Sequence, residues 1–315
     1  TAVRARERKR DRGFSVADFQ WCEDPRGLAR LDDVDVVCEL IGGEGGVAKE
    51  LVEAALSAGK HVVTANKALL AHHGTALAKQ ADGAGLALAY EAAVAGGIPI
   101  VKGLREGLAA NDVQRVYGIL NGTCNYILTT MRETGRSFDD VLKDAQDLGY
   151  AEADPSFDVD GVDAAHKLAI LSALAFGTEV NFDAVHVEGI RHISATDIRV
   201  ADELGYRIKL LGIAERTSAG IAQRVYPLMV KLDQPIATVE GVFNAVVVEG
   251  DFVGTSLFVG RGAGGGPTAS AVVADLIDIA RGYLMRTFAR PAESLQTLVP
   301  VPASARRGAS YVRLM

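Results

Sequence analysis

The chain has 315 residues, of which 49% are hydrophobic and 23% charged, a composition typical of a soluble globular protein long enough for two domains. Its formal net charge of −7 argues against a dedicated nucleic-acid-binding protein, which would usually be basic. No apolar run approaches the ~20 residues that a membrane-spanning helix needs, so we expect neither nucleic acid nor a membrane as a partner.

The first 110 residues predict strands that alternate with helices. Short apolar runs indicate strands at 34–40, 61–64 and 86–92, and helical spacing of apolar residues indicates helices at 47–57 and 69–82. Strands separated by helices of this length are typical of βαβ units, whose strands form a parallel sheet. We therefore predict an α/β fold with a Rossmann-like parallel sheet in this part of the chain.

The three cysteines are too few and too scattered for a disulfide framework or a zinc site. Cys38 lies in the first apolar run, and we predict that it is a small core residue. This usage of cysteine fits a reducing cytoplasm.

The middle of the chain predicts a second domain of the α+β class. Helices are expected at 124–133, 138–148 and 161–176, and strands at 208–214, 221–228, 242–249 and 256–259. Because no helices separate these strands, we expect an antiparallel or mixed sheet.

A glycine-rich segment occupies residues 260–266. Pro267 stands where the first turn of a helix would be, and helical spacing continues over 268–283. The segment 291–308 is rich in Pro, Ser and Arg and predicts a linker. The chain starts directly on a strand-like run at 1–3 and stops on another at 311–315, so we expect an internal portion of a longer protein.

Acidic residues gather before a helix at 145–167, and three interpretations compete. A calcium loop with Gly161 at its sixth position would place Lys167 at the twelfth, where a glutamate is needed, so this interpretation fails. A solvated acidic turn would use Asp158 or Asp160 to cap the helix, and Asp163 and Lys167 would then be an ordinary i,i+4 ion pair.

The third interpretation is a substrate site. Asp163 and Lys167 lie on one face of the predicted helix, and Glu152 and Asp158 come from the preceding loop. Carboxylates can hold an ammonium group, and a lysine beside other charges can have a tuned pKa that suits proton transfer. The residue pattern alone does not choose between the second and third interpretations.

The segment 145–167 reads Ala-x3-Gly-Tyr-Ala-Glu-Ala-Asp-Pro-x2-Asp-Val-x-Gly-x-Asp-x3-Lys, which resembles the signature of homoserine dehydrogenases. Further segments resemble the same family in the same order: 36–43 (VVCELIGG), 63–71 (VTANKALLA), 90–100 (YEAAVAGGIPI), 118–127 (GILNGTCNYI) and 262–274 (GAGGGPTASAVVA). The resemblance covers nearly all of residues 1–285. It implies a cytoplasmic enzyme of threonine and methionine biosynthesis that interconverts L-homoserine and L-aspartate 4-semialdehyde with NAD(P).

The resemblance also implies roles for individual residues. Glu152 and Asp163 would hold the amino group of the substrate, with Asp158 supporting the network. Lys167 would give or take the proton at the reacting oxygen, and Lys67 would lie between cofactor and substrate. Without that context Lys67 would be interpreted as a surface lysine, although the helix dipole disfavours a cation at a helix start.

A monovalent cation, sodium, is implied beside Glu91, held by this carboxylate and by the backbone oxygens of Val94, Gly96 and Ile98. Without the resemblance, a lone carboxylate at a strand end is usually a solvated terminus or a cap. The glycines in this segment allow the backbone to turn its carbonyls inward.

The cofactor site implied by the resemblance involves Gly43, Gly149, Gly264 and Lys67. The family has a strand, a G-x-G-x-x-G turn and a helix before the position of Thr1, so we expect the chain by itself to bind a dinucleotide poorly. The spacing Gly-x-Gly-x-x-Gly does occur at 260–265, but a lone match is weak.

Arginines follow the first strand-like run, and they bear on the choice of cofactor. Arg4 and Arg6 precede the first acid, Glu7, at the place where an NAD-specific site would have an acid for the ribose hydroxyls. Either this basic opening is a solvated loop or it recognises phosphate. Because arginine suits a 2′-phosphate, we predict NADP, with Arg4 in contact.

Taken with the resemblance, these features divide the chain into a nucleotide-binding domain (1–92 and 261–288), a catalytic and dimerisation domain (93–260), and a linker with the start of a possible regulatory domain (289–315). A homodimer or a dimer of dimers is expected, in which the valine-rich strand at 242–248 could pair across a twofold axis. Two alternatives are a Rossmann-type oxidoreductase acting on another amino-acid-derived aldehyde, and a non-catalytic protein that lacks the phosphate loop.

Overall fold

The first sheet of the molecule is small and parallel. The computed structural model describes residues 2–297, 300–305 and 311–312. Three strands lie in the order β3 (Val36–Glu39), β4 (His61–Thr64) and β5 (Leu88–Ala89), and the connections are α1 (Gly46–Ser57) and α2 (Lys67–Gly83). The predicted βαβ arrangement is therefore confirmed.

The third predicted strand, 86–92, is longer than the strand that forms. After β5 the chain tightens into the 3₁₀ turn η2 (Glu91–Ala93). Tyr90 is fully buried there and its hydroxyl donates to the Thr287 carbonyl at 2.9 Å. This long-range contact lies at the point where the strand ends and the turn begins.

The prediction that Cys38 is a core residue is wrong, because its side chain is exposed. Side chains alternate along a strand, and in β3 the neighbours Val37 and Glu39 are the buried ones. Burial of Glu39 is possible because its carboxylate accepts hydrogen bonds from the Ile41 amide at 2.7 Å and the Thr64 hydroxyl at 2.6 Å.

The N-terminal segment lies beside this unit. It contains a two-stranded parallel pair, β1 (Ala2–Val3) with β2 (Gln20–Trp21), and a 3₁₀ helix, η1 (Pro25–Arg30), that packs on α1. Pro25 begins η1 and Asp24 caps it by accepting from the Arg26 amide.

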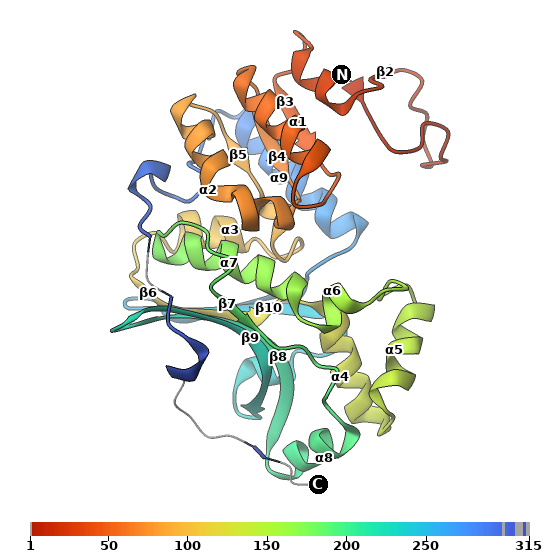
Figure 1. Ribbon diagram of the computed structural model, residues 1–315, viewed down its shortest axis with the longest axis vertical. Helices are drawn as coiled ribbons and strands as arrows, with labels where there is room; N and C mark the ends of the chain where they lie inside the picture. Colours follow the sequence, from red (N-terminus) through yellow and green to blue (C-terminus); the bar gives the residue numbers. More distant parts are fainter. Residues whose placement is uncertain (1, 298–299, 306–310, 313–315) are drawn as a thin grey trace.

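A helix from the far end of the chain returns to the first sheet. The last long helix, α9 (Gly265–Ala280), packs on β4 and η2, so that Val272 joins Val63 and Ala89 in a small apolar cluster. Figure 1 shows this helix among the elements of the first ninety residues. Pro267 lies in its first turn, as the sequence predicts.

The second sheet has six strands in the order β11-β10-β6-β8-β9-β7. Their bounds are β6 (Val113–Ile119), β7 (Val185–Val187), β8 (Tyr206–Thr217), β9 (Gly220–Lys231), β10 (Phe243–Gly250) and β11 (Gly254–Arg261). All neighbours are antiparallel except β7 and β9, which are parallel, so the prediction of an antiparallel or mixed sheet is confirmed.

The strand predicted to pair across a dimer axis is already paired on both edges. In β10, Val246 lies opposite Phe258 of β11 on one side and Gly118 of β6 on the other. Hydrogen-bonded pairing of this strand with a second copy is therefore wrong. β11 is the strand at that edge of the sheet.

The helices of the second unit pack on its sheet or on one another, and Figure 1 shows α7 lying along one face of the sheet. They are α4 (Gly122–Thr134), α5 (Phe138–Asp147), α6 (Ser156–Val159), α7 (Val162–Phe176) and α8 (Ala195–Glu203), and two shorter turns, α3 (Ile100–Lys102) and η3 (Gly103–Gly107), precede them. Helix α7 packs against β6, β8 and β9 below it and against α2 of the first unit above it. It is buried over almost its whole length, and it therefore forms the boundary between the two units.

The predicted linker is in contact with the rest of the molecule over its described part. It includes η5 (Ala292–Ser294), and Gln296 and Pro300 form isolated parallel bridges with Thr178 and Ile221. Leu295 is buried. Of the strand predicted at 311–315, residues 313–315 lie outside the described residues. No helix in the described ranges is long and apolar enough to cross a membrane.

Candidate active site

The candidate site is centred on Asp163, in the first turn of α7. Its side chain is 6% exposed, and it lies one helical turn before Lys167, whose Nζ donates to Oδ2 at 2.8 Å. From the other unit, the Nζ of Lys67 at the start of α2 lies 3.2 Å from Oδ1. Two ammonium groups, 100 residues apart in the sequence, therefore bracket one buried carboxylate.

Helix α7 can begin in the interior of the protein because Gly161 precedes it. This residue has a φ of +87°, and a Cβ there would lie 3.1 Å from Val187 and 3.2 Å from Val225. No side chain caps α7, so the predicted cap by Asp158 or Asp160 is wrong: Asp160 instead pairs with Arg191 at the surface. The solvated acidic turn is likewise excluded by the burial of Asp163.

Asn121 joins the acidic residues, and sequence reasoning missed it. Its Nδ2 donates to Asp158 Oδ1 and to Asp163 Oδ2, both at 2.8 Å, while its Oδ1 caps α4 by accepting from the Cys124 amide at 2.8 Å. The signal available was an asparagine between a strand and a helix, the place of an N-cap. Nothing in the local pattern indicates that the same side chain would bridge two carboxylates.

The charges around Asp163 determine the pKa of its carboxyl group. Burial alone would raise the pKa of Asp163, but the ammonium groups of Lys167 and Lys67 and the hydrogen bonds of Lys167 and Asn121 lower it to about 2. Burial raises the pKa of Asp158, and the negative charge of Asp163 raises it further. Asp163 is therefore the permanent anion of the pair.

Lys167 retains capacity for one more partner. Its Nζ donates to the Leu120 carbonyl at 2.8 Å in addition to Asp163. An ammonium group has three N–H bonds, so one remains among the described residues for a ligand oxygen. Lys67, whose side chain is 32% exposed, borders the solvent-facing side of the cluster.

An aromatic layer lies behind Lys67. Its Nζ is 5.5 Å from the centre of the Phe157 ring, which in turn contacts His166 of α7. Burial lowers the pKa of His166 to about 4, with the nearby His72 adding to the effect, so this ring is neutral at ordinary pH. The layer places an apolar, uncharged surface beside Lys67.

Glu152 and Gly149 lie away from this cluster. The Glu152 side chain is exposed, and its carboxylate makes no hydrogen bond or ion pair with any described residue; only its carbonyl is engaged, by Gln146. Gly149, with a φ of +73°, follows α5 in the same exposed loop. The structure brings Lys67, Asp158, Asp163 and Lys167 together, but not Glu152.

Gly43 and Gly264 lie at the C-terminal edge of β3 and the start of α9. The Gly43 carbonyl accepts from Asn66 Nδ2 at 2.8 Å, which ties this loop to the residue before Lys67. A Cβ at Gly43 would meet nothing within 4 Å, so a ligand can approach the backbone there. Beside it is an apolar pocket, lined by Leu40, Gly264, Gly265, Thr268, Ala269, Val272 and Val273.

The glycines at 260–265 are explained by packing. A Cβ on Gly260 would lie 3.1 Å from Ile98, and one on Gly262 would lie 2.1 Å from the Asn244 side chain. Gly264 has a φ of +120°, which a glycine adopts without strain. The first two glycines are therefore needed for close approach of the backbone to neighbouring elements, and a nucleotide is not required to explain them.

Arg4 lies at the edge of the first unit. Its guanidinium is 5.5 Å from the centre of the Trp21 ring, and its buried Nε makes no hydrogen bond with any described residue. Arg8 approaches the same ring at 5.2 Å. The indole therefore gathers two cations at this edge.

Glu91 is buried at the junction of the two units and caps α3. Its carboxylate accepts from the Val101 amide at 2.9 Å and from the Lys102 amide at 2.8 Å. Burial raises the pKa of Glu91 to about 7 despite these amides. Of the interpretations open in the sequence, a cap is therefore correct and a solvated terminus is wrong.

The backbone oxygens expected to bind a cation together with Glu91 differ in whether they already accept a hydrogen bond. The Ile98 carbonyl accepts from the Ile100 amide at 2.7 Å, whereas those of Val94 and Gly96 accept no hydrogen bond within the described part of the chain. Both residues are buried. Buried residues whose carbonyls have no donor can offer oxygens to a small cation.

Two family models match the chain in the same order as its two units. That of the homoserine dehydrogenase NAD binding domain covers residues 1–91, and that of homoserine dehydrogenase covers residues 99–277. The chain belongs to the homoserine dehydrogenase family.

Individual members of the family agree in sequence and in fold. The homoserine dehydrogenases of Neisseria gonorrhoeae and Pseudomonas aeruginosa are each 57% identical to the chain, over 83% and 79% of its length. The crystal structure of a homoserine dehydrogenase from Thiobacillus denitrificans matches with a TM-score of 0.85 at 50% identity, covering 90% of this chain and 67% of that one. A hyperthermophilic archaeal homoserine dehydrogenase in complex with NADPH matches with a TM-score of 0.70 at 30% identity, covering 82% of this chain and 75% of that one.

The chain spans 60% of the length of the Neisseria homoserine dehydrogenase and 57% of that of the Pseudomonas one. The matched region includes both units and the cluster around Asp163.

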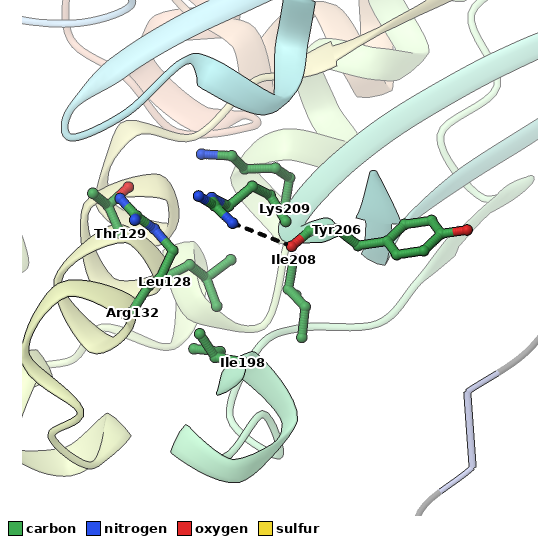
Figure 2. Close-up of a pocket in the computed structure, with 8 residues that line it drawn as sticks. Leu128, Thr129, Arg132, Ile198, Tyr206, Ile208 and Lys209 are labelled. Carbon is green, nitrogen blue, oxygen red and sulfur yellow. Dashed lines mark hydrogen bonds between the residues drawn. The ribbon is translucent and has the colours of Figure 1, made fainter. Parts of the chain in front are cut away.

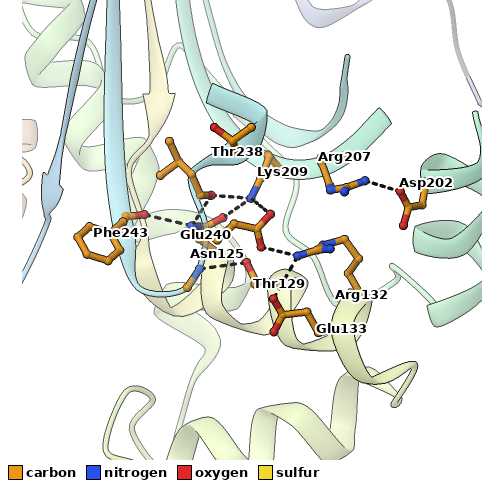
Figure 3. A network of polar contacts seen from close by, with 12 residues as sticks. Asn125, Thr129, Arg132, Glu133, Asp202, Arg207, Lys209, Thr238, Glu240 and Phe243 are labelled. Carbon is orange, nitrogen blue, oxygen red and sulfur yellow. Dashed lines mark hydrogen bonds and ion pairs between the residues drawn. The ribbon is translucent and has the colours of Figure 1, made fainter. Parts of the chain in front are cut away.

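This family member has a second buried polar network along α4, which includes Asn125 and Arg132 of that helix (Figure 3). Lys209 of β8 is 2% exposed, and its Nζ donates to the Val239 carbonyl at 2.6 Å and to Asn125 Oδ1 at 3.1 Å. Glu240 lies 4.0 Å from this ammonium and accepts from Arg132 at 2.7 Å. Burial lowers the pKa of Lys209 to about 8.

A small cavity adjoins this network, as Figure 2 shows. Its lining is Leu128, Thr129, Arg132, Ile198, Tyr206, Arg207, Ile208 and Lys209. The three cations in this lining face three carboxylates outside it: Arg207 pairs with Asp202, Arg132 pairs with Glu133 and Glu240, and Lys209 lies 4.0 Å from Glu240. The cavity therefore carries no unbalanced positive charge.

Proposed function

We propose that the protein carrying this chain interconverts L-homoserine and L-aspartate 4-semialdehyde, using a nicotinamide cofactor for the hydride. The observation that supports this most directly is the buried carboxylate of Asp163 between the ammonium groups of Lys67 and Lys167. It sits at the boundary between the two units, where a substrate held by the α7 side would face a cofactor held by the α9 side.

In this proposal Lys167 moves the proton. The cofactor, when bound, supplies the hydride to the aldehyde carbon or accepts it from the alcohol. The unused N–H of Lys167 gives its proton to the aldehyde oxygen as the alcohol forms, and takes it back in the reverse direction. The contacts to Leu120 and Asp163 fix the direction of that N–H.

Asp163, Asp158 and Glu152 would hold the substrate's ammonium group. Asp163 is anionic throughout the working pH range, because its pKa is about 2. Glu152 has no partner among the described residues and lies on an exposed loop after α5, so it can turn inward when a cation enters. Lys67 would orient the reacting carbonyl from the opposite side.

For the cofactor we propose NADP, bound along Gly43, Gly149, Lys67 and the α9 N-terminus at Gly264. Two observations support binding of the cofactor on this side of the site: the open backbone at Gly43 and the apolar pocket beside Gly264. Arg4 beside Trp21 would contact the 2′-phosphate. The archaeal relative's complex with NADPH favours the same choice.

A sodium ion is proposed at Glu91 with the carbonyl oxygens of Val94, Gly96 and Ile98. A cation there would neutralise a buried carboxylate and would serve a structural purpose at the junction of the two units. We further propose a homodimer, or a dimer of dimers, working in the cytoplasm, with domain bounds of 1–92 with 261–288, 93–260, and 289–315.

The test is an assay of the protein in both directions with each cofactor. We expect turnover of L-aspartate 4-semialdehyde, and more than about tenfold lower kcat/KM for succinate semialdehyde, which lacks the amino group that Asp163 and Glu152 would hold. Equal use of the two aldehydes would favour an oxidoreductase of other specificity. Absence of any turnover with cofactor bound would favour a non-catalytic protein.

A further inference from the structure

Asn244, at the start of β10, is a polar side chain in an apolar place. It is 1% exposed, and its Oδ1 has no hydrogen-bond partner among the described residues. The residues that follow it in β10, Ala245 to Val248, are buried and apolar. A buried amide oxygen left without a donor is rare in folded proteins and needs an explanation.

The Asn244 amide lies between two glycines of different segments, Gly122 at the first position of α4 and Gly262 in the loop before α9. A Cβ on Gly262 would lie 2.1 Å from both Cγ and Nδ2 of Asn244, and a Cβ on Gly122 would lie 3.4 Å from its Oδ1. No φ in the left-handed region holds Gly262 as a glycine, so the closeness of Asn244 is what excludes a side chain there. A Cβ on Gly122 would also lie 2.7 Å from the Val242 carbonyl, two residues before Asn244, so the start of β10 as a whole limits the approach of Gly122, and the Asn244 amide limits that of Gly262.

Each of these segments leads to one half of the candidate site. Gly122 follows Asn121, whose amide holds Asp158 and Asp163. Gly262 precedes Gly264 and the pocket at the start of α9. Its carbonyl also accepts from the Gly96 amide at 3.0 Å, which ties the same loop to the segment after Glu91.

We propose that Asn244 is a positioning residue that sets the spacing between the substrate side and the cofactor side of the site. This inference rests on the proposed function. Asn244 touches neither reactant; it acts through Gly122 and Gly262, which hold the two segments at a fixed separation. A leucine would fill the same space without an unsatisfied amide, so stability alone does not account for the asparagine.

The experiment is a double-mutant cycle in the full-length protein. Gly262→Ala adds the Cβ that collides with Asn244, and we expect kcat to fall on the order of 10- to 100-fold, because small displacements of reacting groups have effects of this size. In an Asn244→Ala background the same Gly262→Ala change should alter kcat by less than about threefold. Asn244→Ala alone should lower kcat while both KM values and Tm change little.

Equal losses from Gly262→Ala in the two backgrounds would overturn the proposal, since the two residues would then act independently. The proposal would also be overturned if kcat fell across the variants only in step with their loss of Tm. Gly83→Ala is the matched control, because its Cβ meets nothing within 4 Å and its φ is ordinary; it should change none of these values.

Hydrogen exchange separates failure of this inference from failure of the proposed function. Exchange of amides at 119–123 and 258–266 should rise in Gly262→Ala and return toward the level of Asn244→Ala in the double variant, whether or not the protein oxidises homoserine. If the wild type is inactive but this pattern appears, the proposed reaction is wrong and the spacing role stands. Exchange that rises in only one of the two segments would contradict the spacing role itself.

Discussion

Two lysines of this chain are buried in similar surroundings, and only one of them belongs to the candidate site. Lys167 and Lys209 each donate to a main-chain carbonyl, that of Leu120 at 2.8 Å and that of Val239 at 2.6 Å. Each also contacts a side chain, and each network is attached to α4. Burial of a lysine by itself therefore does not indicate catalysis.

The difference lies in the second partner. Lys167 contacts the Asp163 carboxylate at 2.8 Å, and Lys67 of the other unit approaches the same carboxylate. Lys209 contacts the neutral amide of Asn125, and its nearest carboxylate, that of Glu240, is 4.0 Å away. The first lysine is held at a boundary between two units, whereas the second is enclosed within one.

Asparagines one helical turn apart on α4 serve the two networks. Asn121 directs its Nδ2 toward Asp158 and Asp163, and Asn125 directs its Nδ2 toward the carbonyls of Val239 and Phe243. The same residue type therefore orders carboxylates in one network and backbone in the other. The chemistry open to each lysine depends on whether its network is built around carboxylates or around backbone carbonyls.

The most direct test of the difference between Lys167 and Lys209 is to remove each ammonium group in turn. Lys167→Ala should lower kcat about 10²- to 10⁴-fold with cofactor affinity near normal, because the proposed proton donor is lost. Lys209→Met, the matched control, should leave kcat within about threefold. Steady-state kinetics and a cofactor titration measure both; comparable losses of kcat in the two variants would remove the distinction.

The second prediction concerns pH and the enclosed lysine. Folding lowers the pKa of Lys209 from 10.5 to about 8, so the unfolded chain binds more protons in that interval. The contribution of Lys209 to the free energy of unfolding should therefore rise with pH from about 8 to 10.5, by up to about 3 kcal/mol. Denaturant titrations of wild type and Lys209→Met would show it; a pH-independent difference between the two would contradict it.

The third prediction concerns the bridging amide. Asn121→Ala should lower kcat/KM by roughly 10-fold, because Asp158 and Asp163 lose a shared donor. It should also lower the free energy of unfolding by about 1 kcal/mol through loss of the α4 cap. Ser137→Ala, which removes the cap of α5 away from the cluster, is the control: a similar loss of stability with unchanged kcat/KM is expected.

The smallest effect should come from the residue that the structure leaves outside the cluster. Glu152→Gln should leave Tm within about 1 °C, because its carboxylate is exposed and has no partner among the described residues. The KM for homoserine should rise several-fold if Glu152 joins Asp163 on the substrate's ammonium group. An unchanged KM would leave Asp163 and Asp158 as the acidic groups that bind it.

The secondary structure was largely predictable from the sequence, because the periods of strands and helices are local properties of the backbone. The strand predicted at 61–64 forms as His61–Thr64, and the helix predicted at 161–176 forms as Val162–Phe176. The pairing of Asp163 with Lys167 also follows from their i,i+4 spacing on one helix.

Other features were decided only by packing between distant segments. Lys67 reaches Asp163 because α2 lies on α7, Asn121 bridges two carboxylates because β6 delivers it beside α6, and Cys38 is exposed because Glu39 takes the buried side of its strand. None of these contacts leaves a periodic trace in the chain. Sequence by itself determined which elements form and which charges share a helix face; the tertiary structure decided which of those charges meet, since that depends on how whole elements bury their apolar sides against one another.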